Sequence, residues 1–325
     1  MVTKRLWGVS ALIAVSLGAL LAPWPASGQG GEVAGVITEI KPGRGQVEVK
    51  AAGTEAWRQA GPLQALRAGD TVRATENASA VILLSGERGS VKVDATGAPV
   101  VVAAPKPGES KLQKARALIE ASLGFLSATP KEPPQAVLST RAGPKLPVIL
   151  TPRNGPVLQE PLVFEWLGSR FSRYTVRIVG PKGLVFERVG VPGARFDYPS
   201  DAPHLSPKVR YSFQVLSLGH PPQEAWFELL EPGRAQAIRQ DLTWLEQTLG
   251  PIVSHNSLVA LRFGVLAREG LFHDARLSLT TALTRDPDEP TLHLLLGNIY
   301  LKTGLPDLAA ESYQEARFLL TAARK

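Results

Sequence analysis

The chain has 325 residues, a length that favours about two or three folded cores over one small domain. Hydrophobic residues make up 44% of the sequence and charged residues 20%, a balance that supports packed cores and excludes disorder of the whole chain. Cysteine is absent, which excludes a disulfide framework, a thiol nucleophile and a cysteine-bound metal.

The first 28 residues have the pattern of an export signal. A basic start at Lys4 and Arg5 precedes an apolar run from Leu6 to Leu21, and small residues at positions 26–28 offer a cleavage site. The run falls just short of the ~18 apolar residues that a spanning helix needs. We therefore expect export to the periplasm or cell envelope, with an uncleaved inner-membrane anchor as the alternative.

The formal net charge of +7 is unevenly distributed. Residues 29–229 carry 24 basic and 18 acidic side chains, whereas residues 230–325 carry 10 and 11. On an exported protein this surplus favours attraction to anionic envelope surfaces over binding to nucleic acid. An ordinary solvated surface is the alternative.

Residues 32–104 read as a small all-β unit, because short alternating apolar stretches are separated by glycine-rich turns. Leu-Arg-Ala-Gly-Asp-Thr-Val-Arg at 66–73, followed by apolar strands at 80–84 and 91–93, resembles the FecR-like domain family. In the family's namesake this domain is the periplasmic half of a transducer that crosses the inner membrane and controls a sigma factor. Only five residues precede the apolar run here, so we do not expect that regulatory role.

Residues 105–145 should hold one helix and a linker. Apolar residues at three- and four-residue spacing, from Leu112 to Leu126, predict an amphipathic helix over 109–126. Cations do not line one polar face of it, as they do in helices that lie on membranes, so we expect the apolar face to dock on a neighbouring domain. The proline-rich stretch at 129–134 predicts a stiff linker.

Residues 146–229 return to β patterns, with strands expected at 162–166, 174–178, 184–186 and 211–215. The stretch from Leu205 to Tyr211 resembles the strand-entry motif of fibronectin type III domains. The resemblance implies a β-sandwich in which the Tyr211 hydroxyl bonds to nearby backbone and Trp166 lies in the core.

Residues 232–325 are predicted to be helical. A helix at 235–249 precedes two helix pairs, 258–268 with 272–285 and 291–302 with 306–320. One series of residues recurs thirty-four positions later: Gly270, Ala275, Leu279 and Ala282 become Gly304, Ala309, Tyr313 and Ala316. The pairs resemble tetratricopeptide repeats, in units 256–289 and 290–323, with the first helix as a cap. The repeated alanines should lie where two helices approach closely.

In repeats of this kind the first helix of each pair lines a concave face. The residues expected to bind a partner there are Arg268, Leu294, Asn298, Leu301 and Lys302. Asn298 can hydrogen-bond a peptide main chain in both directions, and Arg268 and Lys302 can meet a carboxylate. The alternative is that these are solvated polar residues on a repeat that only stacks.

No catalytic, metal or cofactor motif stands out. The five histidines lack the four-residue spacing of a helical zinc site, and Asp197, Asp201 and His204 fit a connection between strands. The four tryptophans after residue 28, Trp57, Trp166, Trp226 and Trp244, fit core packing better than sugar stacking. We expect no catalytic residue, no metal, no cofactor and no small-molecule substrate.

The predicted fold class is multidomain, β plus α, with a FecR-like β domain at 32–104, a fibronectin type III-like sandwich at 146–229 and a helical repeat at 232–325. The predicted function is that of an exported non-catalytic adaptor or scaffold of the bacterial envelope, which binds a partner protein or peptide through its helical repeats. The alternative is a cell-wall or polysaccharide-binding protein whose basic β domains contact an anionic polymer.

Overall fold

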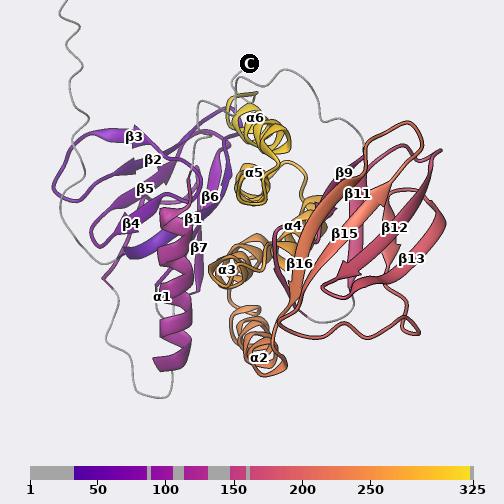
Figure 1. Cartoon of the computed structure of the whole chain (residues 1–325). Helices are drawn as coiled ribbons and strands as arrows, with labels where there is room; N and C mark the ends of the chain where they lie inside the picture. The colour runs from indigo at the N-terminus through magenta and orange to yellow at the C-terminus, as the bar shows by residue number, and fades with distance from the viewer. Residues whose placement is uncertain (1–32, 86–88, 105–112, 131–146, 159–161, 323–325) are drawn as a thin grey trace, which may run out of the picture. The chain divides into compact units, whose positions relative to one another are not determined.

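The structure is a computed structural model, which describes residues 33–85, 89–104, 113–130, 147–158 and 162–322, all within one compact unit. The predicted export signal, most of the predicted linker and residues 109–112 of the predicted helix lie outside the described residues. Two β regions are present, with one helix between them and five helices after them (Figure 1). The β plus α fold class is confirmed.

The first β region consists of two four-stranded sheets, ordered β4-β1-β6-β7 and β3-β2-β5-β8. The strands are β1 (Val33–Lys41), β2 (Val47–Lys50), β3 (Trp57–Gln59), β4 (Ala65–Arg67), β5 (Thr71–Ala74), β6 (Ser79–Leu84), β7 (Ser90–Asp94) and β8 (Val100–Val101). Their inward residues form one core, which includes Ile37, Val72 and Ile82. Gly69 turns the chain at a φ of 90°, and the Asp70 carboxylate accepts hydrogen bonds from two backbone amides beside that turn.

The second β region has a five-stranded sheet, β10-β16-β15-β12-β13, and a three-stranded sheet, β14-β11-β9. Its strands are β9 (Val148–Thr151), β10 (Gly155–Val157), β11 (Val163–Leu167), β12 (Arg173–Gly180), β13 (Gly183–Pro192), β14 (Arg195–Asp197), β15 (Arg210–Leu216) and β16 (Gln223–Leu229). Both sheets contribute to one core, in which Trp166 is only 1% exposed, as predicted. The Tyr211 hydroxyl accepts a hydrogen bond of 2.8 Å from the Ser206 amide, also as predicted.

The helices are α1 (Gln113–Ala128), α2 (Pro232–Leu249), α3 (His255–Arg268), α4 (Phe272–Arg285), α5 (Pro290–Lys302) and α6 (Pro306–Ala322). All five helices predicted after residue 232 are present. Helix α3 begins three residues before its predicted start, because the Ser254 side chain caps it by accepting a bond from the Ser257 amide.

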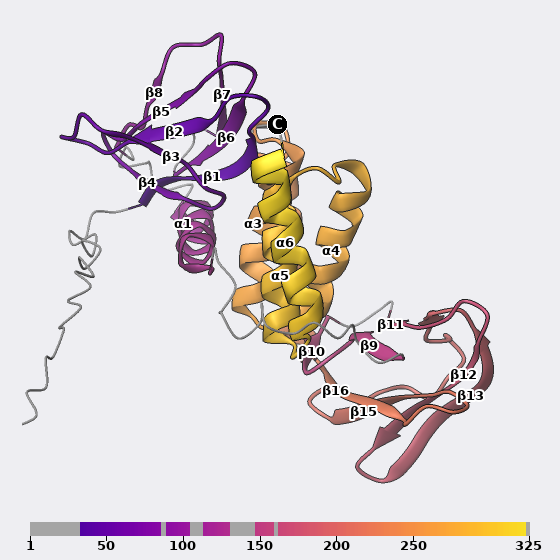
Figure 2. The same ribbon diagram turned by 90° about the horizontal axis from the view of Figure 1, so that it is seen from above.

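The second helix of each pair packs through small residues, as predicted. Ala275, Ala282, Ala309 and Ala316 are all at most 2% exposed. Figure 2 shows α5 and α6 side by side, and Gly297 of α5 lies against the Tyr313 ring of α6. Helix α2 adds Ile238, Leu242, Leu245 and Leu249 to the same helical core. Among the described residues, no helix is long and apolar enough to cross a bilayer.

Candidate functional site

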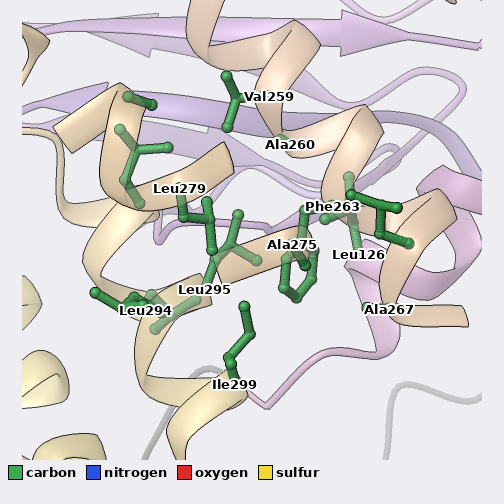
Figure 3. Packing of buried hydrophobic residues seen from close by; sticks show 14 of the residues in the cluster. Leu126, Val259, Ala260, Phe263, Ala267, Ala275, Leu279, Leu294, Leu295 and Ile299 are labelled. Carbon is green, nitrogen blue, oxygen red and sulfur yellow. The ribbon is translucent and has the colours of Figure 1, made fainter. Parts of the chain in front are cut away.

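The surface formed by α3 and α5, the predicted concave face, is partly covered by the chain's own helix α1. Leu126 of α1 is fully buried in the helical core, and the Phe125 ring lies 6.0 Å from the Phe263 ring, centroid to centroid. Figure 3 shows Leu126 beside Phe263. The two helices are in close contact at Gly264, where an added Cβ would lie 3.0 Å from the Ser122 Cβ. Helix α1 therefore docks inside the protein, as expected, but on α3 of the helical region, whereas the sequence suggested one of the two β domains that flank it.

Strand β1 covers the start of the same two helices through polar contacts. The Ile40 amide donates a hydrogen bond of 3.2 Å to Glu289 Oε1, immediately before α5. The Thr38 and Ser257 hydroxyls, which are both buried, lie 2.6 Å apart and share a hydrogen bond. The surface formed by α3 and α5 therefore carries β1 at one end and α1 along α3.

Glu289 is an unusual buried carboxyl group. Burial raises its pKa to about 8, and the charge of Glu39 acts in the same direction, against the hydrogen bonds from Thr291 and Ile40. Since a pKa of about 8 lies above neutral pH, the carboxyl group stays mostly protonated at pH 7. A neutral Glu289 can accept the hydrogen bond from β1 in this interface without a charge being buried there.

The second β region meets the helices through another buried polar group, His273 of α4. Its Nδ1 shares a hydrogen bond with the Thr151 hydroxyl of β9, and burial, helped by the charge of Arg276, lowers its pKa to about 3. Arg276 pairs in turn with Glu165 of β11 at 2.6 Å. His273 is therefore neutral at physiological pH, and its contacts join α4 to the sheet.

A pocket of about 250 Å³ lies where α1 ends, between α1, α3 and α5. Its apolar lining includes Phe125, Phe263, Phe272 and Ile299, and its polar lining includes Asn298 and Lys302. The Asn298 amide nitrogen donates hydrogen bonds of 2.9 Å to the carbonyl oxygens of Pro130 and Leu294. These bonds use both hydrogens of the amide nitrogen, so Asn298 can accept from a peptide but not donate to it, and the prediction that it bonds a main chain in both directions is wrong. Lys302 is exposed to solvent.

The structure brings only some of the predicted partner-binding residues together. Asn298 and Lys302 both line the pocket. Leu294 is 4% exposed within the helical core, and Leu301 is half-buried against that core. Arg268 is exposed outside the pocket lining and pairs with the neighbouring Glu269 at 3.4 Å. The predicted cationic pair of Arg268 and Lys302 is thus not assembled in this pocket.

Sequence reasoning missed the aromatic wall of the pocket. Phe263 occupies a position where the repeat pattern usually has a small residue, and this departure was the available signal. Its ring lies against Phe125, which comes from α1, more than a hundred residues earlier in the chain. Repeat periodicity carries no information about such a contact.

Of the four tryptophans predicted to pack in cores, only Trp166 is fully buried; Trp244 packs half-buried against the helical core, and Trp57 and Trp226 are half-buried at the surface. The guanidinium group of Arg73 lies 4.0 Å from the ring centroid of Trp57, and that of Arg210 lies 4.1 Å from the ring centroid of Trp226. Trp166 is in the core, as stated above. One face of each surface ring is therefore occupied by a cation.

Asp197 is the last residue of β14 and pairs with Arg195 at 3.1 Å. Across the ranges that the structure describes, no three His, Asp or Glu side chains are grouped so that they could hold a metal ion.

Comparison with known proteins adds no family assignment. A scan against protein-family models finds none that matches the chain, and a search of curated proteins finds no match either. The function proposed below depends on this chain's geometry and on the resemblances in its sequence.

Proposed function

We propose that this chain is an exported, non-catalytic adaptor of the bacterial envelope that binds a partner polypeptide in the pocket at the end of α1. The FecR-like, fibronectin type III-like and tetratricopeptide-like sequence patterns support an adaptor built from binding modules. The observation that carries the proposal is the pocket itself, which combines an aromatic wall with Asn298 and Lys302 on the face where such repeats bind peptides.

The size of the pocket favours a polypeptide side chain over a cofactor. Small-molecule sites usually span about 300–1,000 Å³, and this pocket of about 250 Å³ lies below that range. Phe125, Phe263 and Phe272 can enclose one large apolar side chain. Lys302 at the solvent side can pair with a nearby carboxylate of the same peptide.

Both β regions are joined to the helices by buried polar contacts, through Glu289 on one side and His273 on the other. Buried hydrogen-bonded groups fix relative geometry more strictly than apolar contacts, because a displaced partner leaves an unsatisfied polar atom. The helices therefore act as a central support for the two β regions, which suits a scaffold.

Site-specific photo-cross-linking tests the proposal. A benzophenone amino acid replaces Phe272, which lines the pocket, or Phe318, which is 60% exposed on α6, and each protein is exposed to an envelope extract. We expect a protein cross-linked from position 272 but not from position 318, and its loss when Lys302→Glu is added. The absence of any cross-link specific to position 272, or its persistence with Lys302→Glu, would contradict the proposal.

A further inference from the structure

An exposed apolar tip lies at one end of the second β region. Phe171 is 84% exposed in the loop between β11 and β12, and Leu218 is 99% exposed in the loop between β15 and β16. Strands β12 and β15 are hydrogen-bonded neighbours, and Thr175 pairs with Leu216. This register places the two loops next to each other at the same end of the five-stranded sheet.

A third apolar side chain belongs to the same end. Val189 of the edge strand β13 is 72% exposed, and its neighbour Arg188 pairs with Val176 near the start of β12. Single exposed apolar residues are common on soluble proteins. Here, three apolar side chains from three chain segments lie at one end of a sheet, and each is at least 72% exposed. This grouping indicates a surface that another molecule covers.

The charges within the two loops are basic, and an exposed acidic side chain, Glu224, lies beside them at the start of β16. The guanidinium group of Arg170 lies 5.0 Å from the Phe171 ring centroid, and Arg173 is the first residue of β12. Arg188 of β13 lies over Phe186, 5.8 Å from its ring centroid. The two loops, 168–172 and 217–222, contain no aspartate or glutamate. A cluster of apolar residues flanked by cationic side chains complements a bilayer surface that carries anionic headgroups.

We propose that the tip formed by Phe171, Val189 and Leu218 docks on an anionic phospholipid surface. The three apolar side chains enter the boundary between headgroups and acyl chains, and Arg170 and Arg173 meet the phosphates. A protein partner is less well matched, since a specific protein interface typically buries about 800 Å² on each side, whereas this surface consists of loop ends. The inference is independent of the helical pocket, because none of these residues lines it.

Vesicle sedimentation tests the proposal with the chain from Gln29 onward. This chain keeps every described element and lacks the apolar run at 6–21, which would itself bind a bilayer. We expect binding to vesicles of phosphatidylcholine mixed with phosphatidylglycerol, weakening as salt is added, and at least tenfold weaker binding to phosphatidylcholine alone. Phe171→Ser with Leu218→Ser should lower binding to the mixed vesicles more than tenfold.

Two exposed apolar residues elsewhere provide matched controls. Leu184, 59% exposed towards the opposite end of β13, and Phe318, 60% exposed on α6, should be replaceable by serine without loss of vesicle binding. Failure of the unmodified chain to bind mixed vesicles, or equal losses in the control variants, would overturn the proposal.

A second readout uses the absence of cysteine from the sequence. Leu218→Cys and Phe318→Cys each allow one environment-sensitive dye to be attached. We expect the emission of the dye at position 218, and not at 318, to shift to shorter wavelength on mixed vesicles. If Phe171→Ser with Leu218→Ser instead abolishes self-association in lipid-free solution and leaves vesicle binding intact, the tip is an interface between copies and the proposal is wrong.

Discussion

The two halves of the surface formed by α3 and α5 differ in what lies on them. Along α3 the surface is covered by α1, with Leu126 buried and Ser122 against Gly264. Towards the end of α5 the surface is open, and Asn298 and Lys302 line a pocket. The difference shows that a helical repeat pattern predicts the helices, while the rest of the chain decides which part of their shared face stays free to bind.

The largest effect is expected in the covered half, from Leu126→Ala. Truncating a fully buried leucine removes its burial and leaves a cavity, so the free energy of unfolding should fall by about 2–5 kcal/mol. The exposed Phe318→Ala should change it by less than about 0.5 kcal/mol. Urea denaturation measures both. Equal, small effects would mean that α1 does not belong to the helical core.

The second prediction concerns pH and the contact of β1 with Glu289. The folded state keeps the Glu289 proton up to a pKa of about 8, whereas the ordinary value is 4.5. Unfolding therefore releases a proton between these values, so this group's stabilising contribution is complete below pH 4.5 and is lost as pH rises towards 8. The slope should be at most about 1.4 kcal/mol per pH unit.

Glu289→Gln isolates that contribution, since the amide oxygen can still accept the two backbone bonds. Asp274, whose pKa burial raises to about 7, acts in the same direction as Glu289, and His273, with its pKa lowered to about 3, acts in the opposite direction below pH 6.5. The contributions of Asp274 and His273 cancel when the free energy of unfolding of the unmodified chain is compared with that of Glu289→Gln at each pH. A stability difference between the two that stays constant from pH 5 to pH 8 would contradict the assignment.

The third prediction tests the close approach of α1 and α3. In Gly264→Ala the new Cβ would lie 3.0 Å from the Ser122 Cβ, so the helices must separate, and we expect a loss of about 1–3 kcal/mol. Gly124→Ala in α1 is the matched control, because nothing lies within 4 Å of that position. It should stabilise α1 by about 0.5–1 kcal/mol through helix propensity. In thermal unfolding we expect the midpoint to fall in Gly264→Ala and to rise in Gly124→Ala. A stabilising Gly264→Ala would rule out the close contact.

The smallest effect on stability is expected in the open half. Lys302→Glu alters an exposed side chain and should change the free energy of unfolding by less than about 0.5 kcal/mol, while removing the cross-link from position 272. Arg268→Glu is the matched control, since Arg268 does not line the pocket. It should leave the cross-link intact. If both reversals have equal effects on the cross-link, general attraction between charges explains binding better than the pocket does.

Much of the fold followed from local sequence patterns, and the rest depended on contacts between distant segments. The helices around Ala275 and Ala309 follow from spacing that is visible within a few turns, and the core position of Trp166 was implied by the resemblance to fibronectin type III domains. The burial of Asn298 against Pro130 depends on where α1 docks, which no periodicity encodes. Strand β16 was missed because Gln223–Leu229 mixes glutamates and a tryptophan on its outer face with only three inward apolar residues.

The central claim is that α1 forms a fixed wall of the pocket and that partners bind beside it. Ser122→Cys with Gly264→Cys tests this most directly, because the Ser122 Cβ and a Cβ at position 264 are close enough to be bridged after a small separation, and no other cysteine is present. Cross-linking from position 272 is then compared in the oxidised and reduced protein. The account predicts the same cross-linked partner in both states. Loss of the cross-link on oxidation, with recovery on reduction, would show that α1 must leave the groove before a partner can bind.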